Sequence, residues 1–133
     1  LVLRDIELLR KSDSGDVEVG LTITTADENV RKAFEPNSPP VNERIETLGK
    51  LHSAGLKTYA MIAPLLPKAQ GLVALLSGKV DYVLIDMMNY HYADWVYRKH
   101  GLEFAMTPIF FNQNKTELAK AFNNEGIPYR FLF

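Results

Sequence analysis

A chain of 133 residues, 47% hydrophobic and 23% charged, can bury a core and does not have the composition of a disordered protein. Its net charge of −1, with scattered basic residues, gives no case for a nucleic-acid-binding or membrane-surface protein. The absence of cysteine excludes disulfides, thiolate nucleophiles and cysteine-bound metal or iron–sulfur centres within this chain. No apolar run approaches the roughly 20 residues of a membrane span, and no signal-peptide pattern is seen. We therefore expect a cytoplasmic protein without membrane segments.

The first third of the chain predicts a helix, a strand and a second helix. Apolar residues recur at helical spacing over residues 1–11. Residues 17–23 are β-rich and of strand length. Thr25 is followed three residues later by Glu28, which is the pattern of a capping box, so we expect a short helix over residues 26–34.

The next helix and strand have the clearest signals. Ser38 is a candidate N-cap, and Gly55 stands where a left-handed residue should end the helix. One face of this helix is apolar, formed by Val41, Ile45, Leu48 and Leu51. A strand over residues 57–63 follows and ends at the proline-rich residues 64–67.

The remainder of the chain alternates in the same way, with one ambiguous segment. We predict a helix over 69–76, a strand over 80–86, helices over 90–100 and 115–124, and a last strand over 127–133. Within the ambiguous residues 102–111, the sequence TPIFF is compatible with a short strand. Gly126 is the expected cap of the last helix.

Three of the predicted strands, over residues 17–23, 57–63 and 80–86, are almost continuously apolar and are separated by helices. Such runs indicate strands buried on both faces, and therefore a parallel sheet in an α/β fold. Because α/β folds bind ligands at the carboxyl ends of their strands, the candidate site lies at residues 22–25, 63–67 and 86–89.

Five residues at these strand ends are candidates for ligand contact. Thr22 and Thr24 are two apart on one face of a strand, and their hydroxyls can both donate and accept hydrogen bonds. Ala63 offers the small apolar surface that suits a flat ring. Asp86 and Asn89 could bind a substrate or cofactor. The alternative readings are helix capping and β propensity for the threonines, an ordinary strand end for Ala63, and turn chemistry for Asp86 and Asn89.

Arg31 and Arg44, which follow the first predicted strand, are expected to form ion pairs or to face solvent. Arg31 and Glu35 are four residues apart on one predicted helix, and we expect them to pair with each other. A carboxylate ligand is the other possible partner of Arg31. Arg44 is expected on a solvated helix surface or in an ion pair at the rim of the site.

Three segments together resemble one protein family. They are LVLRDIELLRK, VGLTITTADENVRKAFEPNSPPVNERIETLGKLHSAGLKTYAMIAPLLP and VDYVLIDMMNY. In this order they resemble the C-terminal half of the radical S-adenosylmethionine (radical SAM) domain, in the branch of spore photoproduct lyase and DNA repair photolyase. The resemblance covers residues 1–90, whereas residues 91–133 are an unassigned C-terminal extension.

The resemblance implies a fold and two cofactors. The fold is the C-terminal portion of a partial TIM-like (β/α)6 barrel with a mostly parallel sheet, and the 133 residues would form one domain. In the full-length parent, a lyase-type enzyme, an electron from a [4Fe–4S] cluster would cleave S-adenosylmethionine to a radical that abstracts a hydrogen atom from the substrate. Thr22, Thr24, Ala63, Asp86 and Asn89 would contact S-adenosylmethionine. The three-cysteine motif that binds the cluster is absent here, so we expect this chain alone to hold neither cofactor and to be inactive.

The expected partner is the missing N-terminal half of the barrel or a second copy of the chain, because the first strand would otherwise present an unpaired edge. DNA is a possible substrate of the parent. Two alternatives stay open. One is a non-catalytic, truncated α/β domain that self-associates or binds a partner. The other is an unrelated α/β enzyme that binds a phosphate or nucleotide, although the chain has neither G-x-G-x-x-G nor a P-loop motif.

Overall fold

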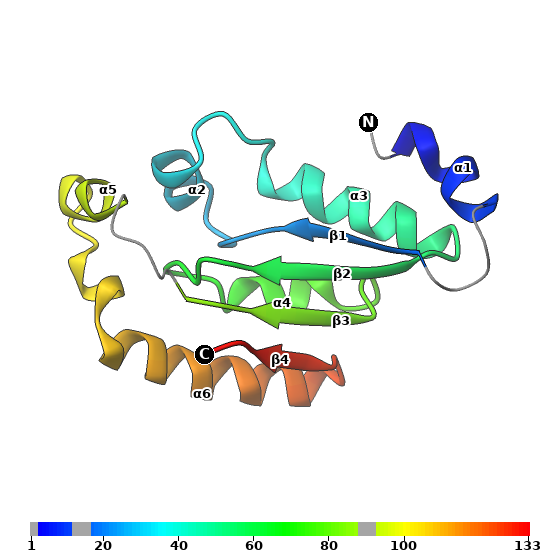
Figure 1. Cartoon of the computed structure of the whole chain (residues 1–133). Coiled ribbons are helices and arrows are strands. Elements are labelled where there is room, and N and C mark those ends of the chain that lie inside the picture. The colour runs from blue at the N-terminus through cyan, green and yellow to red at the C-terminus, as the bar shows by residue number, and fades with distance from the viewer. Residues whose placement is uncertain (1–2, 12–16, 88–92) are drawn as a thin grey trace.

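A four-stranded parallel sheet forms the centre of the protein in the computed structural model, which describes residues 3–11, 17–87 and 93–133 (Figure 1). The strands are β1 (Glu18–Thr22), β2 (Lys57–Ile62), β3 (Tyr82–Ile85) and β4 (Tyr129–Phe131), and they lie in the order β1-β2-β3-β4. Every neighbouring pair is parallel. The predicted α/β class and parallel pairing are thus confirmed, and the last predicted strand covers the edge of β3.

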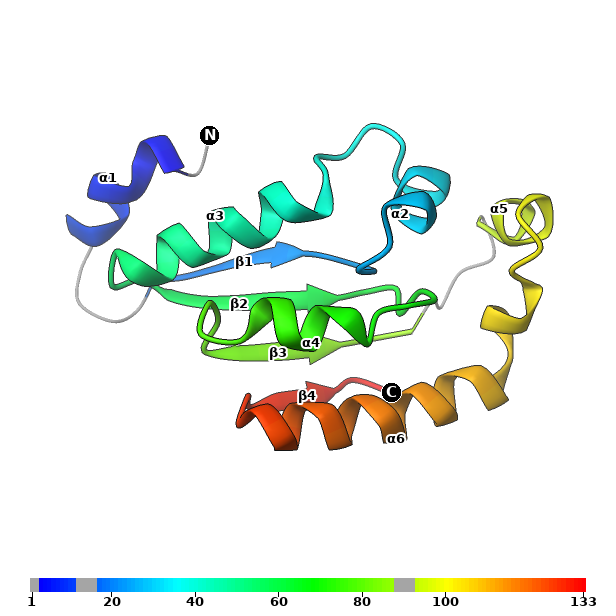
Figure 2. The same cartoon turned by 180° about the vertical axis from the view of Figure 1, so that it is seen from behind.

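The described helices are α1 (Ile6–Lys11, after a 3-10 turn at Leu3–Asp5), α2 (Glu28–Phe34), α3 (Val41–Ser53), α4 (Gly71–Leu76), α5 (Asp94–Lys99) and α6 (Pro108–Glu125), with a 3-10 helix η2 at Glu103–Met106. The helices that pack on the sheet, α3, α4 and α6, share one core with the buried residues of β2. In Figures 1 and 2, which view the sheet from opposite sides, α4 and α6 lie behind the strands in the first view and in front of them in the second. None of the described helices is long and apolar enough to cross a membrane.

The two faces of the sheet differ in burial. In β2, Ala60 and Ile62 are fully buried beneath the helices, while Tyr59 and Met61, which alternate with them, are only half-buried. The prediction that the strands are buried on both faces is therefore wrong for the described residues, because the helices supply only one covering layer. The register places nine residues on the other face, which we call the open face: Glu18, Gly20, Thr22, Lys57, Tyr59, Met61, Tyr82, Leu84 and Arg130.

The capping box predicted at Thr25 is wrong by two residues. Asp27 is the N-cap of α2, and its carboxylate accepts hydrogen bonds from the backbone N–H groups of Asn29 and Val30 at 2.8 and 3.0 Å. The Thr25 hydroxyl instead donates to the carbonyl of Pro67 at 2.6 Å. Thr25 therefore ties the end of β1 to the loop after β2.

The cap predicted at Ser38 is also wrong. Pro40 occupies the N-cap position of α3 and makes no side-chain cap. A carboxylate oxygen of Glu28, on α2, accepts the free N–H of Val41 at 2.6 Å. The Ser38 hydroxyl donates to the carbonyl of Glu35 within the loop. The start of α3 is thus satisfied by a residue 13 positions away, a contact that no local pattern predicts.

The segment that contains TPIFF is helical, so the short strand considered there is wrong. Thr107 is the N-cap of α6, accepting from the N–H of Phe110 at 3.2 Å, and Pro108 is the first helical residue. Proline at this position loses no hydrogen bond, since the first N–H groups of a helix are free in any case. At the other end, Gly126 has φ of 68°, the left-handed cap that was predicted.

Candidate functional site

The carboxyl ends of β1, β2 and β3 lie side by side at one edge of the sheet. The N–H of Ile23 donates to the carbonyl of Met61, and the N–H of Asp86 donates to that of Ile62, both at 2.9 Å, so the ladder continues past the strand ends. Alternation along the strands places Thr22, Ala63 and Asp86 toward the open face.

These three residues differ in their exposure and in the hydrogen bonds of their side chains. Thr22 is exposed, and its hydroxyl has no hydrogen-bond partner within the described part of the chain. Ala63 and Asp86 are half-buried. One carboxylate oxygen of Asp86 accepts from the N–H of Met87 at 2.8 Å, which leaves the other oxygen able to accept from a ligand. Asn89, the remaining candidate in this loop, lies outside the described residues.

Thr24 has a different environment from Thr22. Its side chain is 2% exposed, and its hydroxyl donates to a carboxylate oxygen of Glu35 at 3.0 Å. The same oxygen lies 3.4 Å from the guanidinium of Arg44, which also donates to the carbonyl of Thr22 at 2.8 Å. Thr24 thus takes part in an internal network beside the strand end, and its contact with a ligand stays a prediction.

Two buried arginines hold the loop between α2 and α3. Arg31 pairs with Glu28 at 2.8 Å and donates to the carbonyl of Ser38 at 2.8 Å, so the ion pair predicted between Arg31 and Glu35 is wrong. Glu35 pairs with Arg44 instead. Arg44 is 9% exposed, so of its two predicted environments the solvated surface is wrong and the ion pair is confirmed. It donates to the Ser38 hydroxyl as well. Sequence reasoning missed the Glu35–Arg44 pair because it depends on how the loop folds.

Stacked tyrosines fill the amino-terminal half of the open face. The ring of Tyr59 lies over Gly20, where a β-carbon would come within 2.2 Å of it. Tyr82 stacks on Tyr59 with ring centroids 5.1 Å apart and planes 7° apart, and its hydroxyl donates to Glu18 at 3.2 Å. Burial and this bond to Glu18 raise the pKa of Tyr82, so its hydroxyl remains a donor at neutral pH. Lys57 pairs with Glu18 at 3.1 Å.

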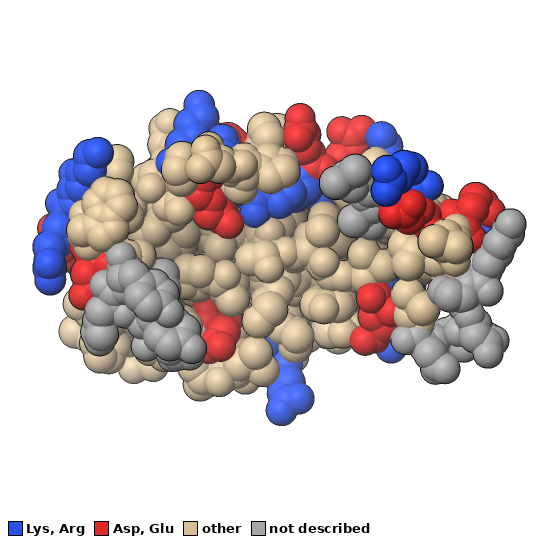
Figure 3. Space-filling view, turned by 45° about the horizontal axis from the view of Figure 1, so that its top comes forward, with Lys and Arg blue, Asp and Glu red and all other residues tan. Residues whose placement is uncertain are grey.

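Among the described residues, no such ring stack fills the carboxyl half of the open face, which is consequently the candidate surface for a ligand. Thr22, Met61 and Leu84 form its surface, with Ala63 and Asp86 at its end. In Figure 3, which is tilted from the view of Figure 1, uncharged side chains occupy the middle of the surface and charged side chains lie around its margin. An uncharged surface with an acidic residue and a hydroxyl at one end suits a ligand with a flat apolar part and hydroxyl groups.

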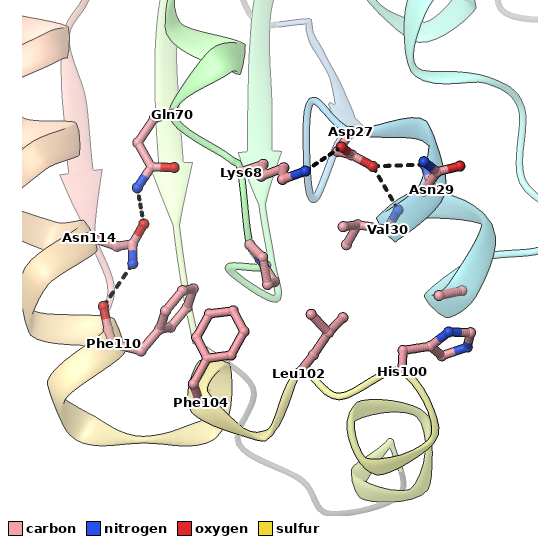
Figure 4. Close-up of a pocket in the computed structure, with 12 residues that line it drawn as sticks. Asp27, Asn29, Val30, Lys68, Gln70, His100, Leu102, Phe104, Phe110 and Asn114 are labelled. Carbon is pink, nitrogen blue, oxygen red and sulfur yellow. Dashed lines mark hydrogen bonds and ion pairs between the residues drawn. The ribbon is translucent and has the colours of Figure 1, made fainter.

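A cavity of about 410 Å³ lies between α2, the loop after β2 and the start of α6 (Figure 4). Asp27 and Lys68 form an ion pair of 3.0 Å at its edge. Asn114 accepts a hydrogen bond from Gln70 and donates to the carbonyl of Phe110 at 2.8 Å. None of the four described site candidates, Thr22, Thr24, Ala63 and Asp86, lines this cavity. Its lining comes from segments too far apart in sequence for any spacing to reveal it.

Asp27 is expected to stabilise the protein by capping α2. Replacing Asp27 with alanine should lower the free energy of unfolding by about 1 kcal/mol. Asparagine is an equally good cap, so Asp27→Asn should lower it by only a few tenths of that amount. Urea unfolding of the two variants measures the difference. Equal losses for alanine and asparagine would show that charge, and not capping, dominates at Asp27.

The same residue gives a pH dependence with a defined sign. The hydrogen bond from Lys68 and those from the backbone lower the pKa of Asp27 below its ordinary value of 3.8. A carboxyl with a lowered folded-state pKa stabilises the protein above its unfolded-state pKa, and this contribution is lost as the pH falls through the folded-state pKa. The free energy of unfolding, measured from pH 6 to 2, should therefore fall less in Asp27→Asn than in the unsubstituted chain. Parallel curves would contradict this.

A metal site is not evident in the described parts of the chain: residues 3–11, 17–87 and 93–133 contain no group of three or more histidine, aspartate or glutamate side chains placed to hold an ion.

Comparison with known proteins finds relatives that are similar in sequence, but it does not assign the chain to a family. No family model matches the chain, and no solved structure does. The chain is 31% identical over 132 residues to the uncharacterized protein MJ0683 of Methanocaldococcus jannaschii, which covers 99% of this chain and 47% of that protein. It is 34% identical over 67 residues to the uncharacterized protein ORF301 of Acidianus two-tailed virus, which covers 50% of the chain and 22% of that protein. The chain thus spans about half the length of the first relative and less of the second.

Proposed function

We propose that this chain is the C-terminal half of a radical SAM enzyme similar to spore photoproduct lyase and DNA repair photolyase, that it helps to position S-adenosylmethionine, and that it is inactive alone. The supporting observation is the edge at which β1, β2 and β3 end side by side, with Thr22, Ala63 and Asp86 on a face that no described helix covers. A parallel sheet with its helices on one side is the arrangement that a segment of a (β/α) barrel would have. The relative MJ0683, about twice as long and matched over 99% of this chain, supports a longer parent.

The groups at this edge fit S-adenosylmethionine in kind. The Thr22 hydroxyl can both donate to and accept from a ribose, and the free oxygen of Asp86 can accept from a ribose hydroxyl or the adenine amino group. Ala63 and Met61 offer apolar surface to the faces of the adenine. When bound in the parent, S-adenosylmethionine and a [4Fe–4S] cluster supply hydrogen abstraction by a radical. This chain has no cysteine, so the ligands of the cluster would belong to the missing half.

The other residues near the edge would hold this surface in place. Arg44 fixes the carbonyl of Thr22 and, through Glu35, the hydroxyl of Thr24. The stacked Tyr59 and Tyr82 would close the opposite end of the open face and keep water from that side. Neither set would take part in proton transfer. Asp86 and Thr22 are therefore the residues whose replacement should affect cofactor binding with the least effect on folding.

The test is to read the coding region upstream of Leu1, express the full-length parent under anaerobic conditions and measure release of 5′-deoxyadenosine from S-adenosylmethionine. We expect a C-x3-C-x2-C motif upstream, and release of 5′-deoxyadenosine once the cluster is reconstituted. Thr22→Val and Asp86→Asn should each raise the KM for S-adenosylmethionine by about tenfold, the effect of one lost hydrogen bond. Thr116→Val, on the exposed side of α6, is the matched control and should leave the KM unchanged. An upstream region without the motif would overturn the proposal.

The main alternative is a non-catalytic domain that self-associates, and the edge of β1 is the observation that favours it. Within the described residues β1 pairs only with β2, so its other edge and the open face could meet a second copy. Sedimentation equilibrium of this chain would reveal a dimer. A monomer at all concentrations, together with cluster-dependent activity of the parent, would exclude this alternative.

A further inference from the structure

The cavity between α2 and α6 is separate from the open face, because none of the nine open-face residues is in its lining. Its volume of about 410 Å³ falls in the range of small-molecule sites. Figure 4 shows Lys68, Asp27 and Val30 on one side of the hollow, and Phe110, Phe104, Leu102 and His100 along the other.

The apolar part of the lining includes an aromatic ring that the fold leaves uncovered. Val30 and Phe110 are buried members of the core, and Leu102 is partly buried against that core. Phe104, however, is 56% exposed at the cavity. Its ring and that of Phe110 form a T-shaped pair, with centroids 5.9 Å apart and planes 74° apart, so Phe110 can cover at most one of the two faces of Phe104. A flat ring stacked on Phe104 would remove apolar surface from water and gain a favourable ring–ring geometry.

The ion pair in the polar part of the lining carries no net charge. Lys68 pairs with Asp27, and the pKa of Asp27 is lowered chiefly by the hydrogen bond from Lys68, so both groups are ionised and cancel each other. The ammonium of Lys68 still has N–H groups to donate, because Asp27 accepts only one of them. The imidazole of His100 makes no hydrogen bond with other described residues.

Lys68 has an unusual backbone conformation for a residue with a long side chain. Its φ is 64°, in the left-handed region, which glycine or asparagine would adopt at lower cost. The lysine side chain is nevertheless directed to the edge of the cavity, where its ammonium meets Asp27 (Figure 4). The conformation is thus compatible with a requirement for a cationic donor at this place.

We propose that this cavity binds a small, uncharged, planar aromatic molecule with a hydrogen-bond acceptor on its edge. The ring stacks on Phe104 between Leu102 and Val30, and the acceptor receives a hydrogen bond from Lys68. An anion is disfavoured by the carboxylate of Asp27, and a cation is disfavoured by the ammonium of Lys68. A saturated ring lacks the flat face that matches Phe104.

Three probes of equal size separate these requirements: benzamide, which has all the proposed features; cyclohexanecarboxamide, which is not planar; and benzoate, which is charged. Each is titrated into the ¹⁵N-labelled chain while amide NMR shifts are followed. Benzamide should give saturable shifts at Val30, Leu102 and Asn114, in the millimolar range expected of so small a ligand. The other two probes should bind about tenfold more weakly, as expected when one contact is lost.

A variant that fills the cavity gives the second arm of the test. Ala33 lines the cavity from α2, and Ala33→Leu should abolish the benzamide shifts. Ala74→Leu, at an exposed position of α4, is the matched control and should leave them unchanged. Should Ala33→Leu fail to fold, Phe104→Ala removes the stacking ring from an exposed position and should weaken binding about tenfold.

The proposal is overturned if benzamide gives no saturable shifts, or if the shifts lie on the open face. It is also overturned if the cavity-filling variant binds benzamide as tightly as the unsubstituted chain does. It is also overturned if benzoate or cyclohexanecarboxamide binds as tightly as benzamide. None of these outcomes depends on a cluster or on S-adenosylmethionine, so failure here and failure of the proposed radical SAM function are distinguishable.

Discussion

Replacing Arg44 with methionine is expected to lower the free energy of unfolding by about 3 kcal/mol, the low end of the range for removing one partner of a buried ion pair. The guanidinium makes contacts to the carbonyls of Thr22 and Pro39 at 2.8 and 3.2 Å, to the Ser38 hydroxyl at 3.1 Å and to the carboxylate of Glu35 at 3.4 Å. The low end applies because the side chain of Glu35 is 26% exposed and water can partly replace the lost charge.

Urea unfolding followed by circular dichroism measures this loss. Arg98→Met, at an exposed position of α5, is the matched control and should change the free energy of unfolding by less than about 0.5 kcal/mol. Combining Arg44→Met with Glu35→Gln tests the pair itself, since neighbours in one network should be coupled by about 0.5–3 kcal/mol. Strict additivity, or a loss no larger than that of the control, would show that Arg44 behaves as a solvated residue, the first of the two environments predicted for it from sequence.

Much of the fold could be predicted because its signals are local. The β-rich segments that became β1, β2 and β3 are separated by amphipathic helices, and that order alone favours parallel pairing. Gly55 and Gly126 marked helix ends because their left-handed conformations, with φ of 89° and 68°, suit glycine best. Each of these inferences rests on a few neighbouring residues, and tertiary contacts did not override them.

The wrong predictions concern groups that found partners far away in sequence. Thr25 was predicted to cap α2, but its hydroxyl bonds to the carbonyl of Pro67, 42 residues away, and Asp27 takes the cap. Ser38 was predicted to cap α3, but the N–H of Val41 at the start of that helix donates to Glu28 instead. In both cases the sequence offered more than one suitable polar residue, and the tertiary arrangement decided between them.

That three of the candidate residues lie at one edge of the sheet could be predicted, whereas their surroundings could not. Thr22, Ala63 and Asp86 could be grouped from sequence, because the carboxyl ends of neighbouring parallel strands must meet at one edge. That Thr24 is buried against Glu35 could not be predicted, since it depends on how the loop between α2 and α3 folds back. Nor could the tyrosine stack, because Tyr59 and Tyr82 are neighbours only through the register of β2 and β3.

Replacing Gly20 with alanine is expected to lower the free energy of unfolding by about 2 kcal/mol, within the range for overpacking a well-packed site. The added β-carbon would lie 2.2 Å from the ring of Tyr59, so the ring must move. It cannot move away from the sheet freely, because Tyr82 stacks on its other side and is held by the hydroxyl bond to Glu18. The strain therefore spreads from β1 to β3 across the open face.

A second glycine gives a matched control for this prediction. A β-carbon on Gly49, in the interior of α3, would meet only the flexible side chain of Lys79, at 3.4 Å. Gly49→Ala should thus be neutral or stabilise the chain by up to about 1 kcal/mol, since alanine favours the helix. Tyr59→Ala removes the obstructing ring. In a chain that carries Tyr59→Ala, Gly20→Ala should therefore lower the free energy of unfolding only slightly. If Gly20→Ala is as harmful without Tyr59 as with it, the ring is not the reason for glycine at this position, and the closed end of the open face would need another explanation.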